Sequence, residues 1–159
     1  MSQATSGSLY QHPDAVPAPA QSWRLYCDAA VWEGGEASVA YALFRRDETR
    51  FIGAGQLRTD DIFLAEARAL FVGLRVAHVM QIRQADAYSD STNLVSLLLD
   101  PRRCARHSRT EYRVALRQIR EAARCLDLVN VRWIPREENR LADVAAHTLL
   151  KPFAQFAGR

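Results

Sequence analysis

The sequence predicts an α/β protein in which one five-stranded mixed sheet is flanked by helices, in the chain order βββαβαβα. Three β-rich segments come first, at residues 24–30, 37–45 and 50–57, and turn-like residues separate them. Strands and helices alternate in the rest of the chain. Short connections make the first three strands antiparallel neighbours, whereas right-handed crossovers place the two later strands parallel to the first.

The helices predicted after the first three strands have start or stop signals in the sequence. Asp60 or Asp61 can cap the first helix, which runs to about Met80 because apolar residues recur there at helical spacing. Ser108 and Glu111 form a capping box for a long basic helix that ends near residue 126. The remaining segments are a strand at 85–89, a helix at 91–99, a strand at 129–134 and a final helix from 138 or 139 to 150.

Length and composition indicate one domain, because 159 residues with 48% hydrophobic content can bury a sizeable core. Residues 1–22, rich in Ser, Gln, Ala and Pro, predict a disordered tail; residues 23–150 form the domain and 151–159 a short C-terminal tail. Three scattered cysteines leave an odd thiol, which indicates a reducing compartment and argues against zinc. Without a signal peptide or a run of about 20 apolar residues, we expect a cytoplasmic protein.

Arginine supplies 20 of the 21 basic residues, although the net charge is only +3. A planar guanidinium holds phosphate through two hydrogen bonds, so this excess suits nucleic acid, but coding bias gives the same ratio without any function. Eight arginines lie together, Arg102, Arg103, Arg106 and Arg109 in a predicted loop and Arg113, Arg117, Arg120 and Arg124 at helical spacing after it. This stripe could contact phosphates or could be the solvated face of an amphipathic helix.

Four acids stand where a soluble fold normally avoids a charge. Asp28 ends an apolar strand, Glu66 interrupts an apolar helix, Asp90 follows another strand, and Asp143 lies among apolar helical residues. A buried carboxylate is costly or takes up a proton unless a cation or a donor compensates it. The strand order brings Asp28 and Asp90 to neighbouring carboxyl ends, with the two helical acids against the same sheet. Because Mg²⁺ prefers oxygen ligands, we expect a divalent metal site.

Each acid also has a structural explanation, as a cap or as the partner of a nearby basic residue. The pairings are Asp28 with a turn, Asp90 with the helix at Ser91, Glu66 with Arg68 or Arg75, and Asp143 with Arg140 or His147. The occurrence of four such acids in this order favours the metal site over four separate explanations.

The segments around these acids form an ordered set. They are Tyr26-Cys27-Asp28, Ala65-Glu66-Ala67-Arg68-Ala69-Leu70, Tyr88-Ser89-Asp90-Ser91 and Arg136-Glu137-Glu138-Asn139-Arg140-Leu141-Ala142-Asp143. In this order and with these predicted elements, the chain resembles the ribonuclease H superfamily, in its reverse-transcriptase-associated, archaeal-like branch, over about residues 23–150. The resemblance implies a ribonuclease H-like fold.

The resemblance also implies a metal-dependent endonuclease that cuts the RNA strand of RNA/DNA hybrids, with two Mg²⁺ or Mn²⁺ ions at its site. Asp28 would bridge both ions, with Glu66 and Asp90 on one of them and Asp143 on the other. Nucleic acid is the expected partner. The expected substrate-binding residues are Asn139, Arg136, Ser91, Thr92, Arg113 and Arg117, and the candidate proton shuttle is His147, one turn after Asp143.

The chain departs from the family pattern at places that bear on substrate choice. Ala29-Ala30 follows Asp28 where many relatives carry Gly-Ser, and the loop before the final helix lacks a histidine, so Arg136 is its nearest substitute. Two alternatives therefore stay open. One is a nucleic-acid-binding or protein-binding module that kept the fold without efficient chemistry, and the other is a DNA-directed nuclease of the same superfamily.

Overall fold

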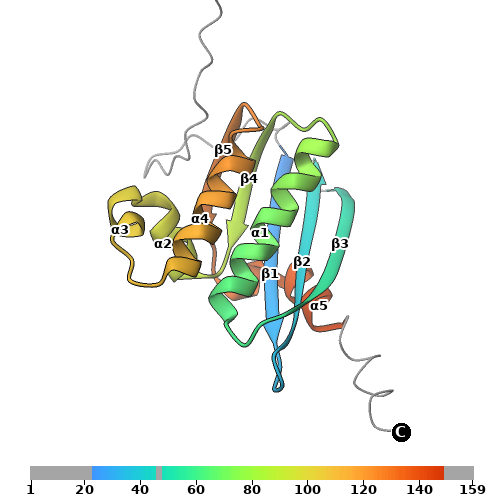
Figure 1. Cartoon of the computed structure of the whole chain (residues 1–159). Coiled ribbons are helices and arrows are strands. Elements are labelled where there is room, and N and C mark those ends of the chain that lie inside the picture. The colour runs from blue at the N-terminus through green and yellow to red at the C-terminus, as the bar shows by residue number, and fades with distance from the viewer. Residues whose placement is uncertain (1–22, 46–47, 149–159) are drawn as a thin grey trace, which may run out of the picture.

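A five-stranded mixed sheet forms the centre of the structure, a computed structural model that describes residues 23–45 and 48–148 (Figure 1). The strands are β1 (Trp23–Val31), β2 (Glu36–Arg45), β3 (Glu48–Arg58), β4 (Gln84–Ser89) and β5 (Leu128–Trp133). Their order across the sheet is β3-β2-β1-β4-β5, with β1 in the middle. β2 is antiparallel to β1 and β3, whereas β4 is parallel to β1 and β5. The predicted fold class is therefore confirmed.

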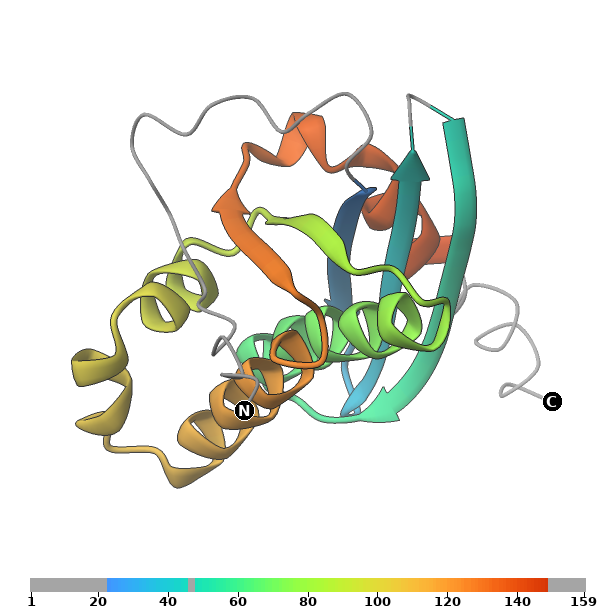
Figure 2. The same cartoon turned by 90° about the horizontal axis from the view of Figure 1, so that it is seen from above.

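Helices cover both faces of this sheet (Figures 1 and 2). α1 (Ile62–Val79) and α4 (Thr110–Ala123) pack together on one face, and α5 (Arg140–Thr148) lies on the other. The remaining helical segments are α2 (Thr92–Leu99), α3 (Pro101–Ala105) and the 3-10 turn η1 (Arg136–Glu138). Within the described ranges, no helix is both long enough and apolar enough to cross a bilayer. The predicted tails, 1–22 and 151–159, lie outside the described residues.

The α1 face of the sheet contains the main core. Alternate residues of β1, Leu25 and Cys27 among them, are buried against α1, as the period-2 pattern of a strand requires. Gly73 of α1 sits directly over them, because a Cβ atom built there would lie 2.8 Å from Leu25 Cδ1 and 3.2 Å from Cys27 Sγ. The missing side chain lets α1 approach β1 closely. Glu66, two turns earlier on α1, is thereby carried toward the sheet.

Small residues bring α5 equally close to the opposite face. Ala30 of β1, Ala40 of β2 and Ala146 of α5 form a buried cluster, and Trp32 packs beside it. The Ser38 hydroxyl donates a hydrogen bond to the carbonyl of Ala146, which fixes the helix against β2. Larger side chains at these alanines would push α5 outward. The close approach matters because α5 carries one of the four acids.

Most predicted helix starts are confirmed, but one is wrong. Asp61 caps α1 by accepting a hydrogen bond from the Leu64 amide at 3.1 Å, and Ser91 caps α2. The capping box of Ser108 and Glu111 does not form, because α4 begins after Arg109, whose side chain makes no capping bond. The Arg109 amide instead donates to the ring of the neighbouring His107.

The arginine-rich segment before α4 also differs from the prediction. Part of the predicted loop forms α3, because Asp100 accepts hydrogen bonds from the amides of Arg102 and Arg103, at 3.0 Å each, and Pro101 suits the first helical position. Arg120 does not belong to the solvated stripe. It is half-buried and donates to the carbonyls of Leu97 and Leu98 at 3.0 Å each, which ties α4 to α2.

Replacing Gly73 with alanine tests the close packing of α1 on β1. Helix propensity alone favours Gly73→Ala by ~1 kcal/mol. We expect the opposite, a fall of about 1–3 kcal/mol in the free energy of unfolding, because the new methyl group overlaps Leu25. Urea denaturation measures the change. Gly55→Ala on β3 is the matched control, since its Cβ atom would meet only Val39 Cγ2 at 3.9 Å. A Gly73→Ala protein as stable as the parent would contradict this packing argument.

Candidate active site

The site lies where β1 and β4 separate. Their parallel pairing ends at Tyr26 and Tyr88, and Asp28 and Asp90 each follow two residues later. Both acids therefore lie at the same edge of the sheet, and the Asn139 amide that donates to the carbonyl of Cys27 also donates to Asp90 Oδ1. β2 and β3 lie on one side of β1, whereas β4 and β5 lie on its other side. The strand order therefore reverses between β1 and β4, and open α/β sheets bind ligands at such a switch point.

Asp28 is the most confined of the four acids. Only 5% of the residue is exposed, and its Oδ1 accepts a hydrogen bond from the Ala29 amide at 2.8 Å. Oδ2 is buried and has no hydrogen-bond partner among the described residues. Burial, followed by the negative charges of Asp90 and Asp143, raises the pKa of Asp28 to about 7. At neutral pH this oxygen therefore favours a proton or a cation beside it.

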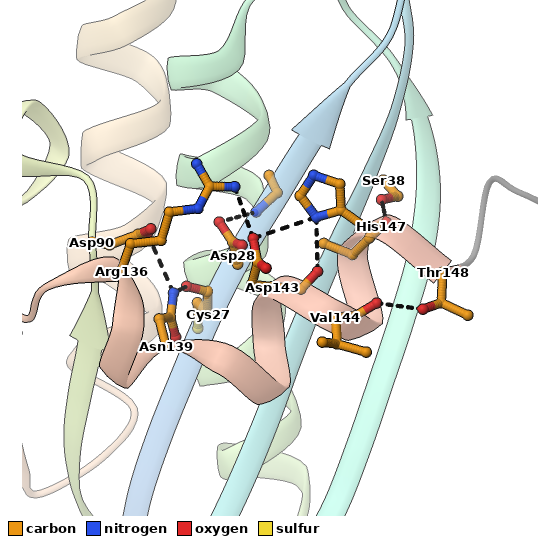
Figure 3. A network of polar contacts seen from close by, with 12 residues as sticks. Cys27, Asp28, Ser38, Asp90, Arg136, Asn139, Asp143, Val144, His147 and Thr148 are labelled. Atoms are coloured by element: carbon orange, nitrogen blue, oxygen red, sulfur yellow. Dashed lines mark hydrogen bonds and ion pairs between the residues drawn. The ribbon is translucent and has the colours of Figure 1, made fainter.

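Asp143 reaches the same site from the first turn of α5 (Figure 3). Partial burial raises the pKa of Asp143, but hydrogen bonds and the positive charge of Arg136 outweigh that effect and hold it below its usual range. Arg136 Nη2 donates to Asp143 Oδ1 at 2.8 Å, and His147 Nδ1 lies 3.4 Å from the same oxygen. The two nearby acids thus have opposite pKa shifts, because Asp28 is much more deeply buried, whereas Asp143 accepts a hydrogen bond from Arg136 and can accept another from protonated Asp28.

Glu66 and Asp90 form the other side of the site. Burial raises the pKa of Glu66, and the negative charge of Asp90 adds to it, whereas a hydrogen bond with Ser91 and the charge of Arg136 oppose the shift. The backbone carbonyl of Asp90 accepts a hydrogen bond from Trp133 Nε1 at 3.1 Å. The four predicted acids are therefore linked in a chain of electrostatic pairs, Glu66 with Asp90, Asp90 with Asp28 and Asp28 with Asp143.

Asn139 holds three of these elements together. Its Nδ2 donates to the carbonyl of Cys27 at 2.9 Å and to Asp90 Oδ1 at 3.3 Å, as Figure 3 shows. Because only 1% of Asn139 is exposed, the side chain lies behind the acids and positions them. The bond to Cys27 spans 112 residues of sequence and fixes the start of α5 against β1.

The other predicted substrate-binding residues lie at two places. Ser91 caps α2 beside Glu66, and the exposed Thr92 is the first residue of that helix. Arg113 and Arg117 lie on the exposed face of α4, and their contacts are local. Arg113 bonds the carbonyl of His107 at 3.1 Å, and Arg117 Nε lies 3.9 Å from a carboxylate oxygen of Glu121. The contacts of these two arginines are therefore with α4 and the loop before it, and not with the four acids.

A network at the start of α1 was not predicted from the sequence. Arg109 Nη1 lies 2.5 Å from Asp61 Oδ2, and the Tyr112 hydroxyl donates to the same oxygen at 2.9 Å. The Tyr112 ring also stacks on Phe63, with 3.9 Å between ring centroids. The Asp61 cap was visible in the sequence, but its partners on α4 lie about fifty residues away and have no local signal. The network anchors the helix that carries Glu66.

Three of these side chains have the arrangement of a metal site. A carboxylate oxygen from each of Asp28 and Asp143 and one ring nitrogen of His147 lie within 4.8 Å of one another. With the unpartnered Oδ2 of Asp28, this donor set suits a divalent cation. The residues present therefore fit a divalent metal of the kind that the sequence predicts.

Comparison with known proteins establishes the family. Residues 26–149 match the model of the reverse transcriptase-like family. The chain belongs to this family, and its fold is ribonuclease H-like. Among curated proteins, no sequence matches the chain.

Solved structures of ribonucleases H share the fold. RNase H1 from the halophilic archaeon Halobacterium salinarum superposes with a TM-score of 0.76 at 22% identity, over 82% of this chain and 98% of that one. The N-terminal RNase H domain of a Mycobacterium tuberculosis protein gives 0.76 at 19% identity, over 87% and 99%. LC11-RNase H1 in complex with an RNA/DNA hybrid gives 0.70 at 15% identity, over 80% and 95%. At these identities the likeness concerns the fold.

Removing the charge of Asp28 should stabilise the metal-free fold at neutral pH. The folded protein binds the Asp28 proton more tightly than the unfolded chain, where the pKa is about 3.9, so this group destabilises the fold progressively as pH rises from 4 toward 7. In the presence of chelator, Asp28→Asn should raise the free energy of unfolding by ~2 kcal/mol at pH 8 and have little effect at pH 4. Denaturant titration at both pH values measures the difference.

Asp127→Asn is the control for that experiment. The hydrogen bond from Arg83 lowers the pKa of Asp127, so the same substitution there should not stabilise the protein at pH 8. Equal behaviour of the two variants would show that the shift of Asp28 has no energetic consequence.

Proposed function

We propose that this protein is a metal-dependent endonuclease that hydrolyses the RNA strand of RNA/DNA hybrids through two divalent ions. The observation that carries the proposal is the buried, unpartnered Oδ2 of Asp28, which is crowded by Asp90 and Asp143 at the switch point of the sheet. Without a cation beside it, a buried carboxylate at this place would be neutralised by a proton, so a bound metal ion explains the aspartate better than a structural role does. The ribonuclease H-like fold and the similarity to LC11-RNase H1, which was solved with an RNA/DNA hybrid, support this substrate.

The four acids would hold the ions between them. Asp28 would bridge the two, Glu66 and Asp90 would hold one, and Asp143 would hold the other. Mg²⁺ or Mn²⁺ bound in this way supplies an activated water and neutralises the charge that develops on the leaving oxygen. Several carboxylates leave coordination positions open, which a scissile phosphate and water can fill.

The remaining residues position these acids and the substrate. Asn139 fixes Asp90 relative to β1, so the spacing of the acids is set before substrate binds. Arg136, exposed and paired with Asp143, can transfer its donors to a phosphate of the bound strand. Ser91 and Thr92, at the start of α2, can donate to a phosphate at a helix N-terminus. His147 lies on the same side of α5 as Asp143, within reach of a proton on the leaving group.

Cleavage of defined substrates tests the proposal. Labelled RNA/DNA hybrid, duplex DNA, duplex RNA and both single strands are incubated with Mg²⁺, Mn²⁺ or chelator. We expect cleavage of the RNA strand of the hybrid with either metal and none with chelator. Asp28→Asn should lower the rate about 1,000-fold or more, because it removes the acid shared by both ions.

Asp127→Asn, on the exposed turn before β5, should retain full activity in the same assay. Tight hybrid binding without turnover would identify a binding module, and preference for DNA would identify a DNA-directed nuclease. Either outcome would replace the proposed activity.

The arginines of α4 should contribute to binding rather than to chemistry. Arg113 and Arg117 lie on α4, away from the acids, so they can hold substrate phosphates at a distance from the reaction. Replacing both by alanine should weaken hybrid binding and lower the slope of log K against log salt by about 1–2, while the rate at saturating substrate changes little. Arg75→Ala, on α1, is the control. An unchanged salt slope would show that α4 does not contact the substrate.

A further inference from the structure

We propose that His147 is a ligand of the ion held by Asp143, so that this position is a mixed oxygen and nitrogen site that prefers Mn²⁺ to Mg²⁺. The inference rests on the proposed function, since it concerns one of the two ions described above. It assigns His147 a role different from proton transfer, because a ring nitrogen that coordinates a metal has no lone pair left to accept a proton.

The placement of the three donors supports this assignment. Asp143 and His147 are one helical turn apart, so their side chains leave α5 in the same direction. One ring nitrogen of His147 and a carboxylate oxygen from each of Asp28 and Asp143 lie within 4.8 Å of one another. Figure 3 shows these side chains, from β1 and α5, turned toward the same space. Small movements of the side chains would bring all three to bonding distance from one ion.

A second observation, independent of the cluster itself, points to a ligand there. Asp28 is only 5% exposed, and its Oδ2 is buried without a hydrogen-bond partner in the described part of the chain. Buried polar atoms in folded proteins are almost always satisfied. A cation between Asp28 and the two donors of α5 would satisfy this oxygen.

The His147 ring is both supported and accessible. Trp32 contacts it edge-on, with 5.9 Å between ring centroids and an interplanar angle of 65°. Nδ1 lies 2.9 Å from the carbonyl of Asp143, which orients the ring toward the acid. The side chain is 44% exposed, so an ion and its remaining waters can approach from solvent.

Two existing contacts must give way to the ion. Arg136 Nη2 donates to Asp143 Oδ1 at 2.8 Å, and the 66% exposure of its side chain allows it to withdraw into solvent. Coordination through Nδ1 of His147 would replace its contact with the Asp143 carbonyl, whereas coordination through Nε2 would keep that contact. The ion would take over from Arg136 in compensating the charge of Asp143.

The chemistry of the donors determines the metal preference. Both ions accept carboxylate oxygens, but Mg²⁺ gains little from a nitrogen ligand, whereas Mn²⁺ is the first member of the transition-metal series whose affinity for nitrogen-containing sites exceeds that of Mg²⁺. A histidine in the site should therefore raise Mn²⁺ affinity with little gain for Mg²⁺. A site of carboxylates alone lacks this reason to discriminate.

Binding and spectroscopy of the full chain test the inference without relying on activity. Calorimetric titration of the parent protein and His147→Gln with Mn²⁺ and with Mg²⁺ gives the affinity ratio. We expect the substitution to weaken Mn²⁺ binding about 10-fold or more and Mg²⁺ binding by much less. His78→Gln should leave both affinities unchanged, because this exposed histidine at the end of α1 lies with its Nδ1 3.2 Å from the Cys125 carbonyl and contributes no donor to the three-residue cluster.

Pulsed electron paramagnetic resonance of bound Mn²⁺ provides a readout that needs no variant. The parent protein should show coupling to a histidine nitrogen, and this signal should change when the histidines are labelled with ¹⁵N. His147→Gln should abolish it, whereas His78→Gln should not. Circular dichroism and thermal melting establish that the variants are folded.

The failure of this inference is distinguishable from the failure of the proposed function. Absence of histidine coupling in the parent protein, or equal loss of Mn²⁺ and Mg²⁺ affinity in His147→Gln, overturns the ligand assignment even when hybrid cleavage depends on Asp28. Histidine coupling with selective loss of Mn²⁺ affinity supports the assignment even when no hybrid is cleaved.

Discussion

The confinement of like charges around Asp28 is the constraint on which the rest of the structure depends. The acid lies on the central strand, nearly inaccessible to solvent, and this burial, together with the neighbouring Asp90 and Asp143, raises its pKa to about 7. Repulsion between like charges drives acids on a protein surface apart, but here the packing of the backbone elements keeps these acids together. Gly73 holds α1 against one face of β1, and Ala40 belongs to the small-residue contact that holds α5 against the other.

The surrounding residues compensate the charge unevenly. Asp143 has a guanidinium from Arg136 and lies near an imidazole, so its pKa falls. Glu66 and Asp28 lack such close cations, and burial raises the pKa of both. Within the described chain, Glu66 and Asp28 therefore lack a close cationic partner, whereas Arg136 beside Asp143 can exchange with an ion or a phosphate. This asymmetry gives the two predicted metal positions different electrostatic environments.

Side-chain contacts connect the acid cluster to α4, the helix that carries Arg113 and Arg117. Arg109 and Tyr112, at the start of α4, bind the capping carboxylate of Asp61, and Arg120 ties the last turn of α4 to the end of α2. α1 carries Glu66, and α2 begins directly after Asp90. A substrate bound along α4 would therefore have a fixed position relative to α1 and α2, the two helices that begin beside the acids. Rigid connections of this kind keep acids and phosphates at fixed separations.

The sequence alone determined the order of the strands and main helices, the Asp61 cap and the four acids, because hydrophobic period, capping chemistry and misplaced charge are local properties. Packing decided the rest. The pairing of Arg136 with Asp143, the placement of Asn139 behind the acids and the burial of Arg120 each depend on how far apart two packed elements lie. No residue spacing along the chain encodes that distance, so only the tertiary structure could determine these contacts.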